Sequence, residues 1–246
     1  MLGKNQIKLI TGLRQKKFRD REGLFFAEGP KVIAELHSAG FKLEKWYAVP
    51  GFSLAGLPEP EPVFEAELAK ISSLTTPNQC LALFQIPVSR DLPDSDTTVL
   101  LDDVRDPGNL GTIVRLCDWF GVTRLVCSPH CADVYNPKVV QATMGSLARV
   151  EVSYMDLAAF ATDFDGEIVG TFMDGESIYD APVGGKTAII MGNEANGISH
   201  AVEKLCDRKI SVPRFGAIQK AESLNVATAA AIILGEVSRR SSVGKK

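Results

Sequence analysis

The stretch TVLLDDVRDPGNLGTIVRLCDWF, residues 98–120, sets the pattern of the fold. Its first four residues form a short apolar run, which predicts a buried strand over Thr98–Leu101. An acidic loop with a Pro-Gly turn follows, and apolar residues then recur at helical spacing from Leu110 to Phe120. A strand that leads through a short loop into an amphipathic helix is typical of an α/β fold with a parallel sheet.

The same alternation continues toward the C-terminus. We expect further buried strands at Arg124–Cys127, Glu167–Phe172, Thr187–Met191 and Lys209–Val212. We expect helices at Asn136–Leu147, at Ile198–Cys206 and from about Ala221 to Arg239. Strands that read as continuous apolar runs indicate a sheet covered on both faces. Ligands of such sheets bind beyond the carboxyl ends of the strands, so the loops there are candidates for the functional site.

A polar segment punctuated by prolines, residues 85–96, separates this region from the N-terminal part of the chain. We place one domain at 1–93 and the other at 97–246. The N-terminal part is expected to be a small α/β domain, with a proline-containing loop at Pro50–Pro62. Its expected helices are Asn5–Leu13 and Pro30–Ala39, and its expected strands are Leu24–Ala27, Lys45–Val49 and Leu81–Gln85.

Composition excludes several classes of protein. The chain has 246 residues, of which 45% are hydrophobic and 23% charged, as in a folded globular protein. No apolar run approaches the roughly 20 residues that a membrane span requires. The N-terminus turns polar and basic at once, so we expect no leader, no membrane partner and a cytoplasmic location. The five cysteines and three histidines are scattered, which favours no bound metal.

The charge is distributed unevenly along the chain. Residues 1–31 hold eight Lys or Arg against three Asp or Glu, although the whole chain has 27 basic and 30 acidic residues. A locally basic segment can neutralise phosphates, which is typical of RNA binding, while the alternative is a solvated helix face. The candidate RNA-binding residues are Arg14, Lys16, Lys17, Arg19 and Arg21.

Three loops carry polar residues at expected strand ends or helix starts. In the first, Asn109 is a candidate N-cap and Arg115 interrupts the apolar pattern of the helix. In the second, Glu194 stands between two glycines that permit close approach of a ligand. In the third, Ser223 and Asn225 precede an alanine-rich helix, and a capping role explains one of them but not both. The chain has neither a Gly-x-Gly-x-x-Gly fingerprint nor a P-loop, which disfavours a nicotinamide-dependent oxidoreductase.

These blocks together resemble the three motifs of the SpoU/TrmH family of RNA ribose 2′-O-methyltransferases, in the SPOUT superfamily. The matching segments are DPGNLGTIVR at 106–115, MGNEANGI at 191–198, ISVP at 210–213 and SLNVA at 223–227. The N-terminal region, with Gly29-Pro30 before a helix, resembles the substrate-binding domain of many members, a small fold like certain ribosomal RNA-binding proteins.

The resemblance implies a parallel-sheet domain whose last segment threads a trefoil knot, with an active site completed across a homodimer. It implies S-adenosylmethionine as the cofactor and S-adenosylhomocysteine as the product. The implied cofactor-binding residues are Thr171, Gly192, Val212, Leu224 and Asn225. The implied catalytic residues are Asn109, Arg115, Glu194, Ser223 and Asn225.

Transfer from a sulfonium requires alignment of a ribose 2′-oxygen and loss of its proton, and it needs no metal. Because arginine does not deprotonate at neutral pH, we expect Arg115 to orient the ribose and a phosphate, with Asn109, Glu194 and Ser223 holding Arg115 and the ribose. The resemblance also favours ribosomal RNA as the substrate, because family members with such an N-terminal domain often act on it. The alternatives are transfer RNA, or a non-catalytic RNA-binding protein on the same fold.

Overall fold

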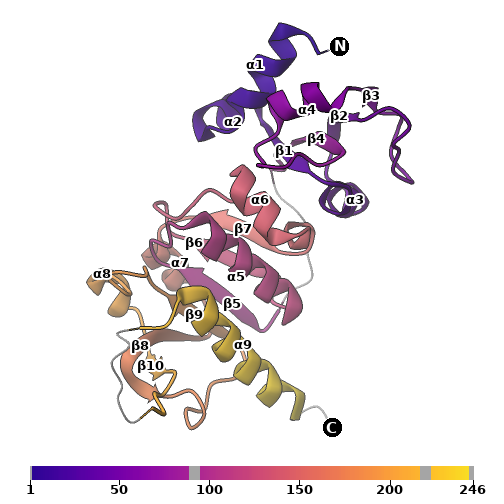
Figure 1. Cartoon of the computed structure of the whole chain (residues 1–246). Coiled ribbons are helices and arrows are strands. Elements are labelled where there is room, and N and C mark those ends of the chain that lie inside the picture. Colours follow the sequence, from indigo (N-terminus) through magenta and orange to yellow (C-terminus); the bar gives the residue numbers. More distant parts are fainter. Residues whose placement is uncertain (1, 89–94, 217–222, 244–246) are drawn as a thin grey trace. The chain divides into compact units, whose positions relative to one another are not determined.

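The computed structural model describes residues 2–88, 95–216 and 223–243 (Figure 1). The chain forms two compact units, one made of residues 1–91 and 133–149 and the other of residues 92–132 and 150–246. Residues 133–149 therefore associate with the N-terminal part of the chain, although they follow the expected boundary in the sequence.

The first unit contains a four-stranded sheet in the order β1-β4-β2-β3. β4 pairs with β1 and with β2 in antiparallel orientation, while β3 pairs with β2 in parallel orientation. The strands are β1 (Leu24–Glu28), β2 (Leu43–Ala48), β3 (Glu61–Pro62) and β4 (Cys80–Gln85). The helices are α1 (Lys4–Gly12), α2 (Lys16–Glu22), α3 (Pro30–Ser38) and α4 (Glu65–Ile71). Ile10, Leu13, Phe26, Leu68 and Leu81 are members of one buried cluster, so α1, α4 and the sheet share a core.

Residues 133–149 pack against β1. They contain α6 (Pro137–Thr143) and the short 3₁₀ turn η1 (Ser146–Ala148). The Tyr135 ring lies 4.8 Å from that of Phe25. The single helix expected through Leu147 is interrupted, because Met144 and Gly145 adopt left-handed backbone angles, with φ of 52° and 96°.

The second unit contains a six-stranded sheet in the order β10-β8-β9-β5-β6-β7, and every neighbouring pair is parallel. The strands are β5 (Thr97–Leu101), β6 (Arg124–Cys127), β7 (Glu151–Tyr154), β8 (Glu167–Ser177), β9 (Thr187–Met191) and β10 (Arg208–Ser211). The helices are α5 (Pro107–Trp119), α7 (Leu157–Asp163), α8 (His200–Glu203) and α9 (Val226–Val243). The expected parallel α/β class is confirmed.

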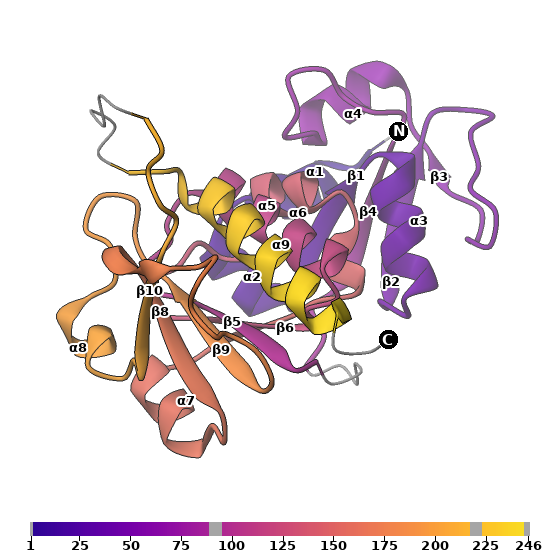
Figure 2. The same ribbon diagram turned by 90° about the horizontal axis from the view of Figure 1, so that it is seen from below.

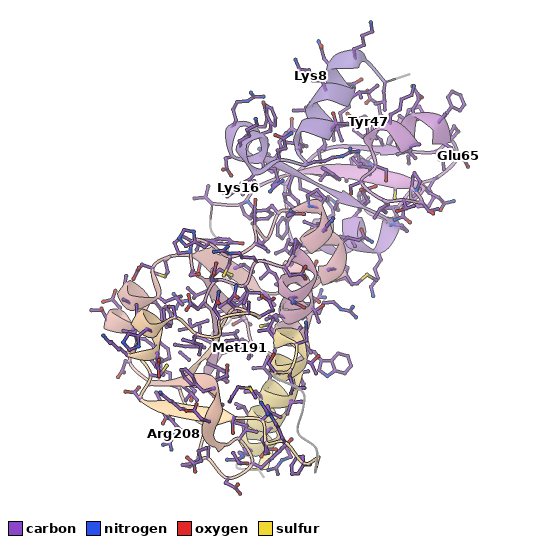
Figure 3. The ribbon with its side chains drawn as sticks, turned by 60° about the vertical axis from the view of Figure 1, so that its left-hand side comes forward. Lys8, Lys16, Tyr47, Glu65, Met191 and Arg208 are labelled. Carbon is purple, nitrogen blue, oxygen red and sulfur yellow. The ribbon has the colours of Figure 1, made fainter. Side chains whose placement is uncertain are left out.

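Helices cover both faces of this sheet. α5 and α9 lie side by side over one face, and α7 and α8 lie over the other (Figures 1 and 2). On the second face, Leu157 and Phe160 of α7 and Val202 of α8 join a core with Leu100 and Ile190 of the sheet. Met191, at the end of β9, is buried in the interior (Figure 3). Burial on both faces explains why the strands read as continuous apolar runs.

The strand order has a topological switch point at the centre of the sheet. From β5 the chain moves outward through β6 and β7, and it later returns to place β9 on the other side of β5. In open α/β sheets, ligands bind at such a switch point, outside the carboxyl ends of the two strands. The loops that follow β5 and β9 are therefore the first place to look for a site.

The observed bounds agree with the expected ones for β6 and β9, while other elements differ. The helices α2, α4 and α7 and the strands β3 and β7 were not predicted, and α8 is shorter than expected. The last helix begins at Val226 and not near Ala221, which lies outside the described residues. In the described part of the chain, no helix is both long and apolar enough to cross a membrane.

Candidate functional site

Three polar side chains from distant parts of the sequence meet at this switch point. The Asn109 side chain donates from Nδ2 to Glu194 Oε1 at 2.7 Å. The Asn225 side chain donates from Nδ2 to Asn109 Oδ1 at 2.9 Å. A continuous chain of hydrogen bonds therefore runs from the start of α9, through the first turn of α5, to the loop after β9. We call these three residues the amide-carboxylate chain.

The first turn of α5 fixes the position of Asn109. Asp106 caps this helix, because its carboxylate accepts from the backbone N–H of Asn109 at 2.8 Å. Pro107 follows at the first helical position, where its missing N–H costs nothing. The expectation that Asn109 is the N-cap is wrong. Because Asp106 takes that role, the Asn109 side chain is free to bridge Glu194 and Asn225.

Asn225 has two tasks at the start of α9. Its Oδ1 accepts from the backbone N–H groups of Ala227 at 3.0 Å and Thr228 at 3.2 Å, while its Nδ2 reaches Asn109. Capping thus explains Asn225, as expected for one of the two polar residues. The other, Ser223, is exposed and makes no hydrogen bond within the described part of the chain.

The loop after β9 is tied to the loop after β5 by two residues that sequence reasoning missed. Asn193 donates from Nδ2 to the Asp103 carbonyl at 2.8 Å, and its Oδ1 accepts from Ala195 N–H at 2.8 Å. The buried Asp102 accepts from Ser199 N–H at 2.8 Å. Asp102 directly follows β5 and Asn193 comes two residues after β9, and these positions at the ends of apolar strands are the signal that could have identified them. They hold the loop that carries Glu194.

Gly192 allows this loop to close on itself. A Cβ at this position would lie 2.2 Å from the Gly197 carbonyl carbon and 2.2 Å from the Ile198 nitrogen. Asn193 and Gly197 exchange two backbone hydrogen bonds, at 3.0 and 2.8 Å. The backbones on the two sides of the loop therefore pass so closely that only glycine fits.

The loop after β6 also forms hydrogen bonds with the end of β5 and the loop that follows it. Ser128 Oγ accepts from Asp103 N–H at 2.9 Å, and the Cys131 thiol donates to the Leu101 carbonyl at 3.3 Å. A hydrogen bond from Cys127 lowers the pKa of Cys131 to about 7, and the same contact together with burial raises the pKa of Cys127.

Among the described residues, no group of three His, Cys, Asp or Glu side chains is arranged to hold a metal ion.

Arg115 lies apart from the amide-carboxylate chain. At about 100° per residue, six residues of helix place it about 120° around α5 from Asn109. It is exposed, and it makes no hydrogen bond or ion pair within the described part of the chain. The structure of this chain therefore does not join Arg115 to Asn109 or Glu194.

The expected cofactor-binding residues lie at the carboxyl edge of three adjacent strands. Gly192 follows β9 and Val212 follows β10, whereas Thr171 lies within β8, one residue after its last pair with β9, because β8 continues to Ser177. Leu224 is partly exposed and directly precedes Asn225. In the described part of the chain, Gly192, Val212 and Leu224 have no hydrogen-bond partner for their backbone N–H groups. These groups fit a ligand that is held through the backbone.

The five basic candidates of the first unit have different surroundings. Lys16 is exposed and pairs with Asp20, while Arg21 pairs with Glu22; Lys17 lies 5.0 Å from the centre of the Phe18 ring. Arg14 donates to the Ser72 carbonyl at 2.6 Å and remains exposed. Figure 3 shows Lys8 and Lys16 pointing outward.

Arg19 is the exception among these five. It is 2% exposed, donates to the Leu13 carbonyl at 2.8 Å and pairs with Asp133 at 2.5 Å. A side chain that contacts RNA has to be accessible, so the structure assigns Arg19 to the interior of the first unit.

Two family models match the chain. The model of the SpoU rRNA Methylase family matches residues 96–235, and that of the MRM3-like substrate binding domain matches residues 4–82. Among curated proteins, the chain is 31% identical to 23S rRNA (guanosine(2553)-2′-O)-methyltransferase RlmP of Bacillus subtilis (strain 168). That match covers 94% of this chain and 95% of RlmP.

Solved structures are similar over nearly the whole chain. A putative RNA methyltransferase of the TrmH family from Porphyromonas gingivalis is 36% identical with a TM-score of 0.87, over 98% of this chain and 99% of that one. The SpoU methyltransferase AviRb from Streptomyces viridochromogenes, in complex with AdoMet, is 26% identical with a TM-score of 0.84, again over 98% and 99%.

Proposed function

Because the chain belongs to the SpoU rRNA methylase family, we propose that it transfers a methyl group from S-adenosylmethionine to a ribose 2′-hydroxyl of ribosomal RNA. The amide-carboxylate chain carries this proposal, because it assembles residues of all three resembling motifs beyond the carboxyl ends of β5 and β9. The relatives named as rRNA 2′-O-methyltransferases and the AdoMet-bound neighbour support the substrate class and the cofactor.

The residues at the strand ends fit this cofactor. Gly192, Val212 and Leu224 would hold it through their backbone N–H groups, with Thr171 and Asn225 beside them. When bound, S-adenosylmethionine supplies a methyl group already activated by a sulfonium. What this chain has to add is alignment of the ribose oxygen, exclusion of water and stabilisation of the developing alkoxide.

The protein groups have separate roles in this scheme. Asn109, fixed between Glu194 and Asn225, presents an amide that orients the ribose, and Ser223 contributes a hydroxyl beside it. Arg115 binds the ribose oxygen and an adjacent phosphate and stabilises the developing negative charge. Because its guanidinium stays protonated, the 2′-hydroxyl proton passes to the phosphate or to water.

The position of Arg115 supports a homodimer. Since it lies about 120° around α5 from Asn109 and makes no hydrogen bond or ion pair in the described chain, we propose that it serves the site of a second subunit. The trefoil knot implied by the resemblance, which would enclose the cofactor between the loops after β9 and β10, stays part of this proposal.

We also propose that the chain divides functionally into an RNA-binding domain at 1–93 and a methyltransferase domain at 97–246. The matched ranges 4–82 and 96–235 support this division. Residues 133–149 would then lie within the sequence range of the methyltransferase domain, although they pack in the first compact unit.

We expect a Lys16→Glu/Lys17→Glu variant to bind RNA about tenfold more weakly at low salt, with little change at high salt. Both lysines are exposed, and each lost phosphate contact reduces the counterion-release contribution to affinity. Fluorescence anisotropy with labelled rRNA fragments measures the effect. Lys138→Glu, another exposed lysine of the first unit, is the matched control. Equal RNA affinities for both variants would show that the basic segment is a solvated helix face and does not bind RNA.

The function itself is tested by transfer of labelled methyl from S-adenosylmethionine into total RNA, which is then size-fractionated and digested to nucleosides. We expect label in a 2′-O-methyl nucleoside from the ribosomal fraction. Label in the small-RNA fraction would identify transfer RNA as the substrate instead. Cofactor binding without label, including with unmodified precursor rRNA, would favour a non-catalytic RNA-binding protein.

A further inference from the structure

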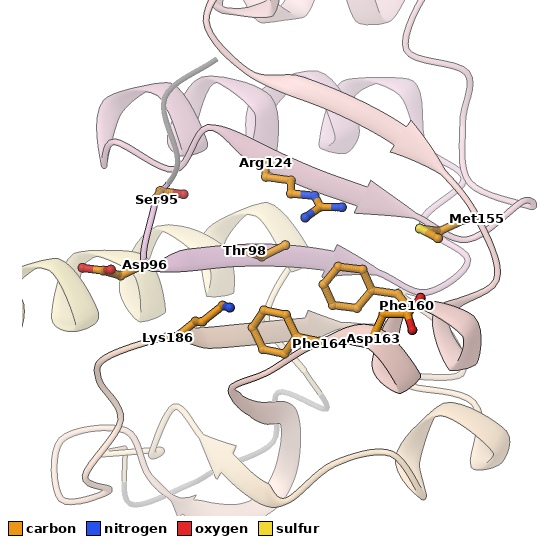
Figure 4. Close-up of a pocket in the computed structure, with 9 residues that line it drawn as sticks. All are labelled: Ser95, Asp96, Thr98, Arg124, Met155, Phe160, Asp163, Phe164 and Lys186. Carbon is orange, nitrogen blue, oxygen red and sulfur yellow. The ribbon is translucent and has the colours of Figure 1, made fainter. Parts of the chain in front are cut away.

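A cavity of about 520 Å³ lies along the α7 face of the parallel sheet, away from the amide-carboxylate chain. Its cations Arg124 and Lys186 lie at the amino edge of the sheet, while Met155 and Phe160 line it farther along the strands (Figure 4). Arg124 begins β6, Thr98 is the second residue of β5, and Lys186 directly precedes β9. Since these strands are parallel, their amino ends share one edge and the catalytic loops share the other. At about 3.3 Å per residue, the four steps of β5 separate the two edges by about 13 Å. We call this cavity the amino-edge pocket.

In the described part of the chain, two cations of this pocket have no carboxylate partner. The Arg124 guanidinium lies 5.5 Å from the centre of the Phe160 ring, and Lys186 Nζ lies 5.7 Å from the centre of the Phe164 ring. The rings stack on each other at 5.1 Å. Within the described part of the chain, neither cation forms an ion pair or a hydrogen bond. A ring face holds a cation weakly and satisfies none of its N–H donors, so both remain available to an anion.

Thr98 supplies an unused hydroxyl at the floor of the pocket. Its side chain is 5% exposed and lines the cavity, yet its hydroxyl makes no hydrogen bond in the described part of the chain. Thr98 pairs in register with Arg124 of β6, so its hydroxyl stands beside one of the two cations and is available to a ligand in the pocket.

Two carboxylates, Asp96 and Asp163, complete the lining, and both are exposed. They would repel a bare anion that filled the whole cavity. They would accept hydrogen bonds from hydroxyl or amino groups of a ligand whose anionic part lies at Arg124 and Lys186. The ligand class that combines a phosphate with such donors, at a size suited to about 500 Å³, is a nucleotide.

The geometry points to a second, non-catalytic nucleotide site: we propose that the amino-edge pocket binds the phosphate of a nucleotide between Arg124 and Lys186 over Thr98. Its sugar hydroxyls or base amino groups would face Asp96 and Asp163. The nucleotide is either a unit of an RNA strand or a free mononucleotide, and both present the same phosphate. This site extends beyond the proposed methyl transfer and does not require it.

The test is calorimetric titration of the full-length protein with each of the four nucleoside 5′-monophosphates and with the four nucleosides. S-adenosylhomocysteine is present at saturation, so that adenosine-containing ligands cannot enter the cofactor site. In parallel, anisotropy measures the affinity for a labelled 12-nucleotide single-stranded RNA. The variants are Arg124→Gln/Lys186→Gln and the isosteric Thr98→Val. Lys204→Gln, an exposed lysine of the same unit without an ion pair in the described chain, is the matched control.

We expect the double variant to bind at least tenfold more weakly, Thr98→Val to bind severalfold more weakly, and Lys204→Gln to match the unsubstituted protein. Unchanged S-adenosylhomocysteine affinity shows that the variants are folded. Weakened binding of mononucleotides identifies a free nucleotide as the source of the phosphate, while an effect confined to the oligonucleotide identifies RNA. The proposal is overturned if neither affinity responds to the double variant, or if nucleosides bind as tightly as their monophosphates.

Discussion

Arg115→Ala is expected to reduce the single-turnover rate of methyl transfer by about a hundredfold or more, while cofactor affinity stays unchanged. Loss of one preorganised donor to a developing oxyanion has a cost of this size. Because Arg115 is exposed and unpaired in the described chain, its removal leaves no buried group unsatisfied and should not lower stability. Arg115→Lys keeps the charge but not the planar fork, so an intermediate rate is expected.

A mixed dimer tests whether Arg115 acts across subunits. We would combine an Arg115→Ala subunit with an Asn225→Ala subunit, each inactive in its own homodimer. If the arginine of one subunit serves the other, the mixed dimer regains one intact site and about half of the activity per dimer. If Arg115 acts within its own subunit, both sites of the mixed dimer remain defective. A fully active Arg115→Ala homodimer would remove Arg115 from the mechanism altogether.

Gly192→Ala is expected to weaken cofactor binding at least tenfold and to lower the thermal midpoint. The added Cβ would lie 2.2 Å from backbone atoms of Gly197 and Ile198, which cannot rotate away as a side chain would. The loop that carries Glu194 must therefore move. Overpacking of this kind costs about 1–3 kcal/mol, and each kcal/mol corresponds to about 2–4 °C in a domain of this size.

Gly184→Ala is the matched control for this variant, because a Cβ at Gly184 meets no atom within 4 Å. Titration with S-adenosylmethionine well below the thermal midpoint separates lost affinity from unfolding. If Gly192→Ala and Gly184→Ala bound the cofactor equally well, the loop after β9 would have no part in holding it.

Local sequence patterns predicted the elements whose signal is complete within a few residues. The strand at Arg124–Cys127 follows a glycine stop, and Thr187–Met191 ends at Gly192, so both were predicted with their observed bounds. The helices α2 and α4 were missed, because short, highly charged segments carry little apolar periodicity. Asp106 was missed as the cap of α5, since Asn109 has an equally suitable side chain three residues later.

By itself, the sequence determined the parallel α/β class, the three loops and the polar residues in them, because apolar runs and turn residues act over short distances. Only the tertiary structure decided which of these residues meet. The placement of β9 beside β5 joins Glu194 to Asn109, and the turn into α9 adds Asn225. The tertiary structure also buries Arg19 in an ion pair with Asp133, and it leaves Arg115 exposed and apart from the amide-carboxylate chain. Asn109 is separated by 85 positions from Glu194 and by 116 positions from Asn225. Contacts over such separations leave no local signal in the sequence, because strand order and helix packing bring the residues together.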